Sequence, residues 1–149
     1  AIDFSDLEMT ANLKDLRRLN LGAASIIYNT ELIEEMDSDL ELLVADGGRF
    51  DLQLAGDGNL RIQTNGNVIG GVAGSLRRIV YEMEGAGLIG GHALVAQSAE
   101  VRIRNGGEVE VKATDSLNVT IEGTGKVCYK GTAVVTANVG NNGELLDCN

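Results

Sequence analysis

The sequence predicts an all-β protein: a parallel β-helix, in which the chain coils through about seven turns, or rungs, of one solenoid. Three observations support this prediction. A short pattern recurs about every 20 residues, apolar and polar residues alternate within it, and proline is absent from all 149 residues. Such repeats are typical of a solenoid, whose units bury their apolar faces only against their neighbours. Proline would remove backbone donors from the ladders that join successive rungs.

One serine or glycine in each repeat marks a predicted bend and sets the register. These residues are Ser25, Gly48, Gly66, Gly87, Gly107, Gly125 and Gly143. Two positions after them stand Ile27, Phe50, Val68, Ile89, Val109, Val127 and Leu145. Four positions before them stand Leu21, Val44, Ile62, Met83, Ile103, Ile121 and Val139, and six before stand Leu19, Leu42, Leu60, Tyr81, Val101, Val119 and Ala137. We expect each set to stack as one ladder of core side chains.

Alternation at a period of two predicts a strand on each side of every bend. Residues 101–104 and 109–111 show it most clearly, and Asn105-Gly106 between them is a strong turn dipeptide. Because this dipeptide is also common in antiparallel hairpins, a β-sandwich or barrel is the alternative fold. We favour the β-helix because only a coil requires the same kind of residue at a fixed place in every repeat.

A chain of this length is expected to form one domain over residues 1–149. Residues 1–18 are predicted to cap the solenoid or form its first strand, and residues 19–149 to form the repeats. The longest insertion, residues 29–43, is predicted to form a short helix or a surface loop. Its acidic residues are Glu31, Glu34, Glu35, Asp37, Asp39 and Glu41, and Leu32, Ile33 and Met36 follow a helical spacing.

The net charge of −10 disfavours nucleic acid and anionic membrane surfaces as partners. No apolar run approaches the length of about 18 residues that a membrane-spanning helix needs, so no membrane span is expected. No signal peptide is visible, because residues 1–4 enter alternating sequence directly. A mature or trimmed chain would look the same, and the sequence therefore leaves the compartment open.

Cys128 and Cys148 are the only cysteines, too few for a disulfide framework. In the predicted register both face outward, but Cys148 lies two residues further along its rung than Cys128. This offset and the step between rungs separate their Cα atoms by about 8 Å, beyond the reach of a disulfide unless the tail bends. We therefore expect them to be unpaired.

No catalytic, cofactor-binding or metal-binding residue is predicted. The acidic insertion lacks the order of carboxylates found in calcium-binding loops, so a solvated acidic surface is favoured over a Ca²⁺ site. His92, the only histidine, is expected to be a surface or loop residue, because no nucleophile motif accompanies it. Residues 85–90 are similar to a dinucleotide-binding loop, but no crossover helix follows them, so a solenoid bend explains them better.

The main alternative function is that of a polysaccharide-active enzyme or a carbohydrate-binding module. β-Helix enzymes of the pectate lyase type place acidic and basic residues along one outer sheet. A comparable set is predicted on one outward face here: Arg102, Arg104, Glu108, Glu110 and Lys112. Alternating unlike charges also keep an exposed sheet soluble, and no convergent acid and base can be named. We therefore expect a protein without enzymatic activity.

The last third of the chain resembles a known family. Residues 84–87, 113–127 and 129–131 match motifs of the auto-transporter adhesin head GIN domain family (DUF2807), which is common in Bacteroidetes. Its signature Leu-x-Val-x-Ile-x-Gly-x-Gly-x-Val-x-Tyr-x-Gly runs here from Leu117 to Gly131. Family chains are usually longer at the N-terminus, and Ala133 replaces the usual proline. The resemblance implies a right-handed β-helix, export to the cell envelope, and an adhesin-like or scaffold role, without catalytic residues to transfer.

These expectations combine into a secreted or envelope-anchored β-helix domain that works through its surface. Surface glycans or envelope proteins are the expected partners. We expect the C-terminal edge to be covered, because Glu144 is the only charge in residues 135–145 and an uncharged strand edge invites pairing. We expect residues 146–149 or a second copy to cover this edge.

Overall fold

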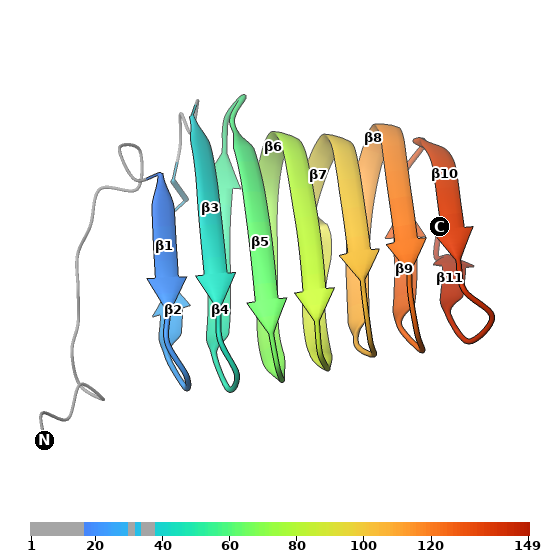
Figure 1. The fold of residues 1–149 in the computed structure, drawn as a ribbon. Helices are drawn as coiled ribbons and strands as arrows, with labels where there is room; N and C mark the ends of the chain where they lie inside the picture. The colour runs from blue at the N-terminus through green and yellow to red at the C-terminus, as the bar shows by residue number, and fades with distance from the viewer. Residues whose placement is uncertain (1–16, 30–31, 34–37) are drawn as a thin grey trace, which may run out of the picture.

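The computed structural model describes residues 17–29, 32–33 and 38–149. This part of the chain is all β and contains no helix. Parallel strands coil into a flattened solenoid of about six turns, which confirms the predicted fold class (Figure 1). The prediction of about seven rungs is slightly high. It counts the seven predicted bends, but bends separate turns, so seven bends enclose six turns.

Two parallel sheets form the solenoid, here called the front sheet and the rear sheet as Figure 1 presents them. The front sheet contains β1 (Arg18–Leu21), β3 (Asp39–Val44), β5 (Asn59–Asn65) and β10 (Val134–Val139). The rear sheet contains β2 (Ile26–Tyr28), β4 (Arg49–Ala55), β9 (Lys126–Lys130) and β11 (Glu144–Asp147). The three longest strands start in the rear sheet, pass round the upper bend and end in the front sheet: β6 (Val68–Glu84), β7 (Gly87–Ile103) and β8 (Glu108–Ile121).

The chain runs down the front sheet, crosses to the rear sheet at the lower bends, and rises there while it advances toward the C-terminus (Figure 1). This path is a right-handed coil, as the family resemblance implies. Each turn pairs with the turns before and after it: β8 pairs with β7 on one side and with β9 and β10 on the other. Stability therefore depends on contacts between neighbouring turns.

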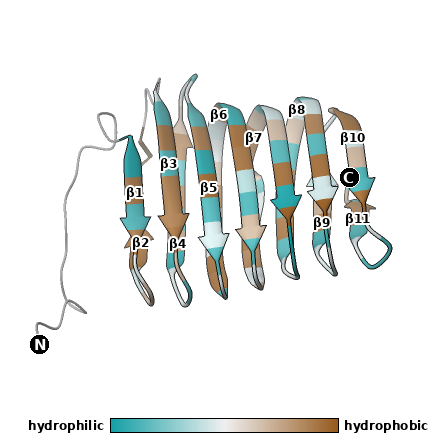
Figure 2. Cartoon of the chain, in the orientation of Figure 1, coloured by the Kyte–Doolittle hydropathy of each residue, from teal (hydrophilic) through white to brown (hydrophobic). Residues whose placement is uncertain are grey.

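Alternate residues along each strand point into the space between the sheets or out to solvent, which gives the bands of Figure 2. The predicted ladders of the later turns are confirmed. Ile103 pairs with Ile121 in the front sheet, and Val109 pairs with Val127 in the rear sheet. All four side chains are at most 1% exposed. The alternation read from the sequence therefore identifies the core.

The third predicted repeat is wrong by two residues. Val44 pairs with Thr64 rather than with Ile62, so Thr64 occupies a place predicted to be apolar. Its side chain is 1% exposed, and its hydroxyl has no hydrogen-bond partner among the described residues. The sequence analysis aligns Gly66 with the bend residue Gly87 of the next turn. In the structure Gly87 pairs with Val68 instead. Asn65-Gly66 is a strong turn dipeptide and Thr64 is polar, so the sequence pattern places this bend two residues too early.

The observed register explains how the core accommodates its two buried aromatic side chains. Gly70 pairs with Phe50, and a Cβ atom at Gly70 would collide with the Phe50 ring. A Cβ atom at Gly91 would likewise collide with the Tyr81 hydroxyl. Each large side chain therefore occupies space that a nearby glycine leaves empty.

Most of the helix predicted in the acidic insertion lies outside the described residues, as do residues 1–16 of the predicted cap. The described parts of the insertion contain β structure and no helix. Ile33 forms an isolated parallel bridge with Leu54, and Asp39 begins β3. The insertion is therefore shorter than predicted, because residues 39–43 belong to a strand.

Cys128 and Cys148 form a disulfide, so the prediction that they are unpaired is wrong. Leu146 pairs with Cys128, and the predicted offset of two residues is therefore correct. The error was to extend the strand straight through Cys148. β11 ends at Asp147, whose carboxylate accepts hydrogen bonds from the backbone and side-chain nitrogens of Asn149 at 3.1 and 2.6 Å. The bend leaves the two cysteine Cα atoms 5.8 Å apart, within disulfide range.

The C-terminal end of the solenoid is open among the described residues. The tail is fastened to the preceding turn instead of lying over β10, since Asn149 Oδ1 accepts a hydrogen bond from the Gly131 backbone nitrogen at 2.8 Å. Strand β10 pairs only with β8, contains no charged residue, and leaves Val134 75% exposed. The tail therefore does not cover this edge, and pairing with a second copy there stays a prediction.

Replacing Ile121 with alanine should lower the free energy of unfolding by about 2–5 kcal/mol, because the change opens a cavity in the stacked core. Thr120→Ala is the matched control, since Thr120 is adjacent and points outward; it should change stability by less than about 0.5 kcal/mol. Denaturant titration monitored by circular dichroism measures both. Equal effects of the two substitutions would contradict the assigned facing of this strand.

Reducing the Cys128–Cys148 disulfide should lower the free energy of unfolding by about 3 kcal/mol, the value for a closed loop of similar length. The measurement is denaturant unfolding with and without a reducing agent. A Cys128→Ser, Cys148→Ser double variant should have the stability of the reduced protein, with or without reductant. If reductant does not change the stability of the wild type either, the pairing is contradicted.

Candidate functional site

Charged side chains gather on the outer surface of the front sheet, here called the front face. Because the sheet is parallel, residues at the same place in successive turns lie side by side about 4.8 Å apart. Glu41 has Arg18 on one side and Arg61 on the other in this way. The charged residues that take part in ion pairs on this face are Arg18, Glu41, Arg61, Arg78, Glu82, Glu100 and Arg102.

Ion pairs join opposite charges of the front face. Arg61 Nη2 donates to both carboxylate oxygens of Glu82, at 3.0 and 2.8 Å. Arg78 and Arg102 both contact Glu100, at 3.0 and 3.1 Å. The hydrogen bond and the charge of Glu82 raise the pKa of Arg61 above its ordinary value. These side chains remain 24–54% exposed, so the charges stay in contact with solvent.

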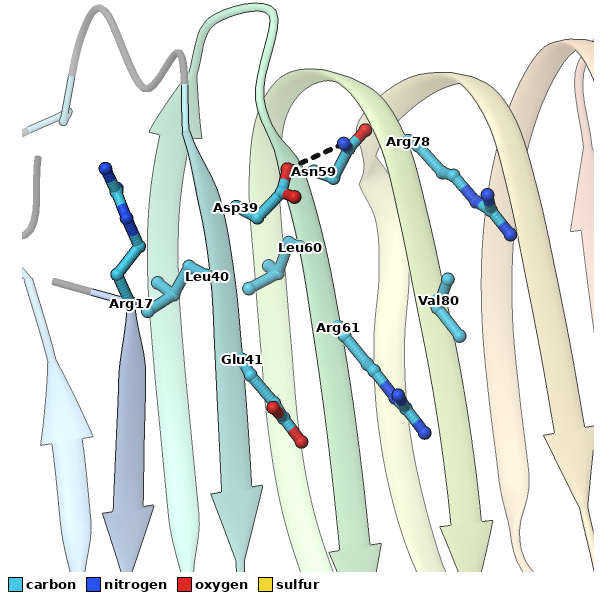
Figure 3. Close-up of a pocket in the computed structure, with 9 residues that line it drawn as sticks. All are labelled: Arg17, Asp39, Leu40, Glu41, Asn59, Leu60, Arg61, Arg78 and Val80. Atoms are coloured by element: carbon cyan, nitrogen blue, oxygen red, sulfur yellow. Dashed lines mark hydrogen bonds between the residues drawn. The ribbon is translucent and has the colours of Figure 1, made fainter.

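An open depression of about 380 Å³ lies on the front face over β3, β5 and the second half of β6 (Figure 3). Six of its nine lining residues are charged or polar: Arg17, Asp39, Glu41, Asn59, Arg61 and Arg78, beside Leu40, Leu60 and Val80. The Asn59 side-chain nitrogen donates to Asp39 Oδ1 at 2.7 Å. Hydrogen-bond donors and acceptors are thus mixed on a surface that a large partner can reach.

The two carboxylates of the depression do not point toward one another. Figure 3 shows Asp39 directed toward Asn59, whereas Glu41 extends along the sheet in the same direction as Arg61. Glu41 also lies 3.6 Å from Arg18. A typical glycosidase needs two carboxyl groups that flank one scissile bond. Asp39 and Glu41 are therefore not directed at one common point in this structure.

The outward set predicted for a polysaccharide-active enzyme is divided between two faces. Arg102 lies on the front face, in the second half of β7, and Arg104 lies in the lower bend that follows. Glu108, Glu110 and Lys112 lie in the first half of β8, on the rear sheet. The chain crosses from one sheet to the other between these two groups. The prediction of one shared face is wrong, and the five residues do not form one groove.

His92 lies on strand β7, on the outer surface of the rear sheet, where the pairing with β8 shifts register. It is therefore a surface residue, as expected, but not a loop residue. Its Nδ1 lies 2.8 Å from Glu110 Oε2, and its Nε2 lies 3.0 Å from the carbonyl oxygen of Cys128. Both partners are acceptors, and since a neutral imidazole has one N–H, only the protonated ring donates to both. His92 thus connects β7 with β8 and β9.

The ion pairs Arg61–Glu82 and Arg78–Glu100 were not predicted from the sequence. A signal for them exists, because the paired residues are 21 and 22 positions apart, close to one repeat. Many other unlike charges share that spacing. The signal becomes usable only when the register of each turn and the facing of each side chain are known.

Within the part of the chain that the structure describes, no group of three His, Cys, Asp or Glu side chains could hold a metal ion. The same residues form no apolar helix long enough to span a membrane. The fold and the front face define a β-solenoid that presents an open, hydrogen-bonding outer sheet.

Comparison with known families makes the assignment specific. The model of the family described as "Putative auto-transporter adhesin, head GIN domain" (DUF2807) matches residues 3–133. The chain belongs to this family, which confirms the resemblance found in its sequence. We find no significant match to the chain among curated proteins or among solved structures.

The front-face ion pairs should contribute little to stability. Arg61→Gln or Glu82→Gln should change the free energy of unfolding by less than about 1 kcal/mol, because exposed ion pairs gain little over their hydrated partners. Denaturant unfolding at low salt and at about 1 M NaCl measures the effect, which should vanish at high salt. A loss above about 2 kcal/mol that persists in salt would show that the pair serves the fold.

Proposed function

We propose that this chain is a non-catalytic, adhesin-like binding domain that holds polar partners on its front face. The open depression carries the proposal, because arginine, asparagine and carboxylate groups stand side by side in it. The membership of an adhesin head family supports the same role. The divergence of Asp39 and Glu41 supports binding over a reaction.

Surface glycans are the partner class that fits these groups best. Sugar hydroxyls both donate and accept hydrogen bonds. The depression offers donors from Arg61, Arg78 and Asn59, and acceptors from Asp39 and Glu41. The contact between Arg61 and Glu82 holds the guanidinium in place, which reduces the conformational entropy lost when a partner binds.

The cell surface, the periplasm or the medium is the proposed location. A disulfide between Cys128 and Cys148 supports this location, because disulfides persist in oxidising compartments and are rare in the cytosol. The name of the family points to the same compartments.

The purified chain should bind a subset of a glycan array, and an Asp39→Ala, Arg61→Ala double variant should bind that subset at least about tenfold more weakly. Lys112→Ala is the control: it also removes a cation, but on the rear sheet. Calorimetry on the best glycan gives the dissociation constants. If the wild type and the double variant bind the glycan with equal affinity, the front face is not the binding surface.

The enzyme alternative is tested with the same protein. Incubation with a panel of bacterial and plant polysaccharides should release no new reducing ends and no unsaturated products. Release of either by the wild type would establish the polysaccharide-active alternative. If the immobilised chain retains envelope proteins but binds no glycan, the partner class is protein and not glycan.

A further inference from the structure

An uncharged surface lies on the rear sheet, on the opposite side of the solenoid from the front face. It consists of residues from the first halves of β6 and β7 and is here called the rear patch: Ile69, Gly71, Ala73, Ser75, Leu88, Gly90, Ala93 and Val95. His92 also lies on this part of β7, where it contacts Glu110 of β8. Ile69 and Leu88 pair with one another and are 48% and 39% exposed. Exposed apolar patches with a charged border are typical of contact surfaces.

The middle of the rear patch is flat because Gly71 pairs with Gly90 there. Neither glycine has a positive φ, so backbone conformation does not require glycine. A Cβ atom would also fit, since it would meet nothing closer than 3.7 Å at Gly71 and 3.8 Å at Gly90. The fold itself therefore does not explain these two glycines. They do allow another flat surface to approach the sheet closely.

Charged residues border the rear patch on both sides: Arg49 and Asp51 on β4, and Glu108 and Glu110 on β8. The ladder of Ile69 and Leu88 continues to Arg49 on β4 and to Glu108 on β8. Within the described chain, neither Arg49 nor Glu108 forms an ion pair. From β4 to β8 the order along this ladder is cation, apolar, apolar, anion. Beyond these strands it continues to Ile26 on β2 and to Lys126 on β9.

We propose that the rear patch binds the rear patch of a second copy of this chain in a two-fold symmetric dimer. An axis that runs parallel to the strands, between β6 and β7, exchanges Ile69 with Leu88 and Arg49 with Glu108. Each Ile69 then packs against the partner's Leu88, and each Arg49 faces the partner's Glu108. Self-complementarity of this kind is what a two-fold interface requires.

The neighbouring ladder is compatible with this arrangement. Gly71 faces the partner's Gly90, which lets the two sheets reach the separation of about 10 Å found between stacked sheets. Asp51 faces the partner's Glu110, and their repulsion is reduced because Glu110 already contacts His92 at 2.8 Å. Both front faces remain exposed on the outside of the dimer. The inference therefore does not depend on the proposed function.

Sedimentation equilibrium of the 15.7 kDa chain over a concentration series tests the dimer. The wild type should shift from monomer to dimer as the concentration rises. Leu88→Lys should weaken association at least tenfold, whereas Val80→Lys, an outward position on the front sheet, should not. Arg49→Glu and Glu108→Arg should each weaken association, and the double variant with both changes should restore it. Thermal unfolding of each variant checks that it is folded.

Three results would overturn the proposal. The first is a wild-type chain that stays monomeric at millimolar concentration. The second is a folded Leu88→Lys variant that associates as the wild type does, or a double charge reversal that restores nothing. The third is association that Val139→Lys abolishes and Leu88→Lys does not, which would place the contact at the C-terminal edge.

Discussion

The space between the two sheets constrains every inward side chain of this protein. Successive turns are about 4.8 Å apart, so each core side chain contacts the one at the same place in the next turn. A large residue must therefore be matched by a small one nearby, as Phe50 is by Gly70 and Tyr81 by Gly91. Burial raises the pKa of Tyr81, and its hydroxyl has no partner in the described chain. Tyr81 therefore contributes to the core by filling space, and its hydroxyl makes no hydrogen bond with the described residues there.

Sequence patterns identify the solenoid because a coil repeats its inward places at a nearly constant interval. Ladders such as Ile103–Ile121 follow from alternation and spacing alone. The pattern fails where one repeat departs from it chemically: Thr64 is polar in an apolar place, and Gly70 has no side chain to reveal its facing. The Cys128–Cys148 bond was missed for a related reason. It depends on a local bend after Asp147 that strand spacing does not contain.

The surface is harder to predict than the core, because outward residues of the two sheets are alike in composition. Arg102 and Glu108 are close in sequence but lie on opposite sheets, since the lower bend separates them. Arg61 and Glu82 are distant in sequence but touch. A shift of two residues in one repeat is enough to change which charges meet. The front-face network therefore became visible only with the observed register.

The disulfide makes the two ends of the solenoid unequal. In a stack of turns that contact only their neighbours, unravelling begins at an end, because an end turn has one neighbour instead of two. The bond from β11 back to β9 fastens the last turn to the one before it. No such crosslink joins the first described turns, β1 and β2, to those that follow. Among the described turns we therefore expect partial opening to begin on the N-terminal side and the C-terminal turns to lose their structure last.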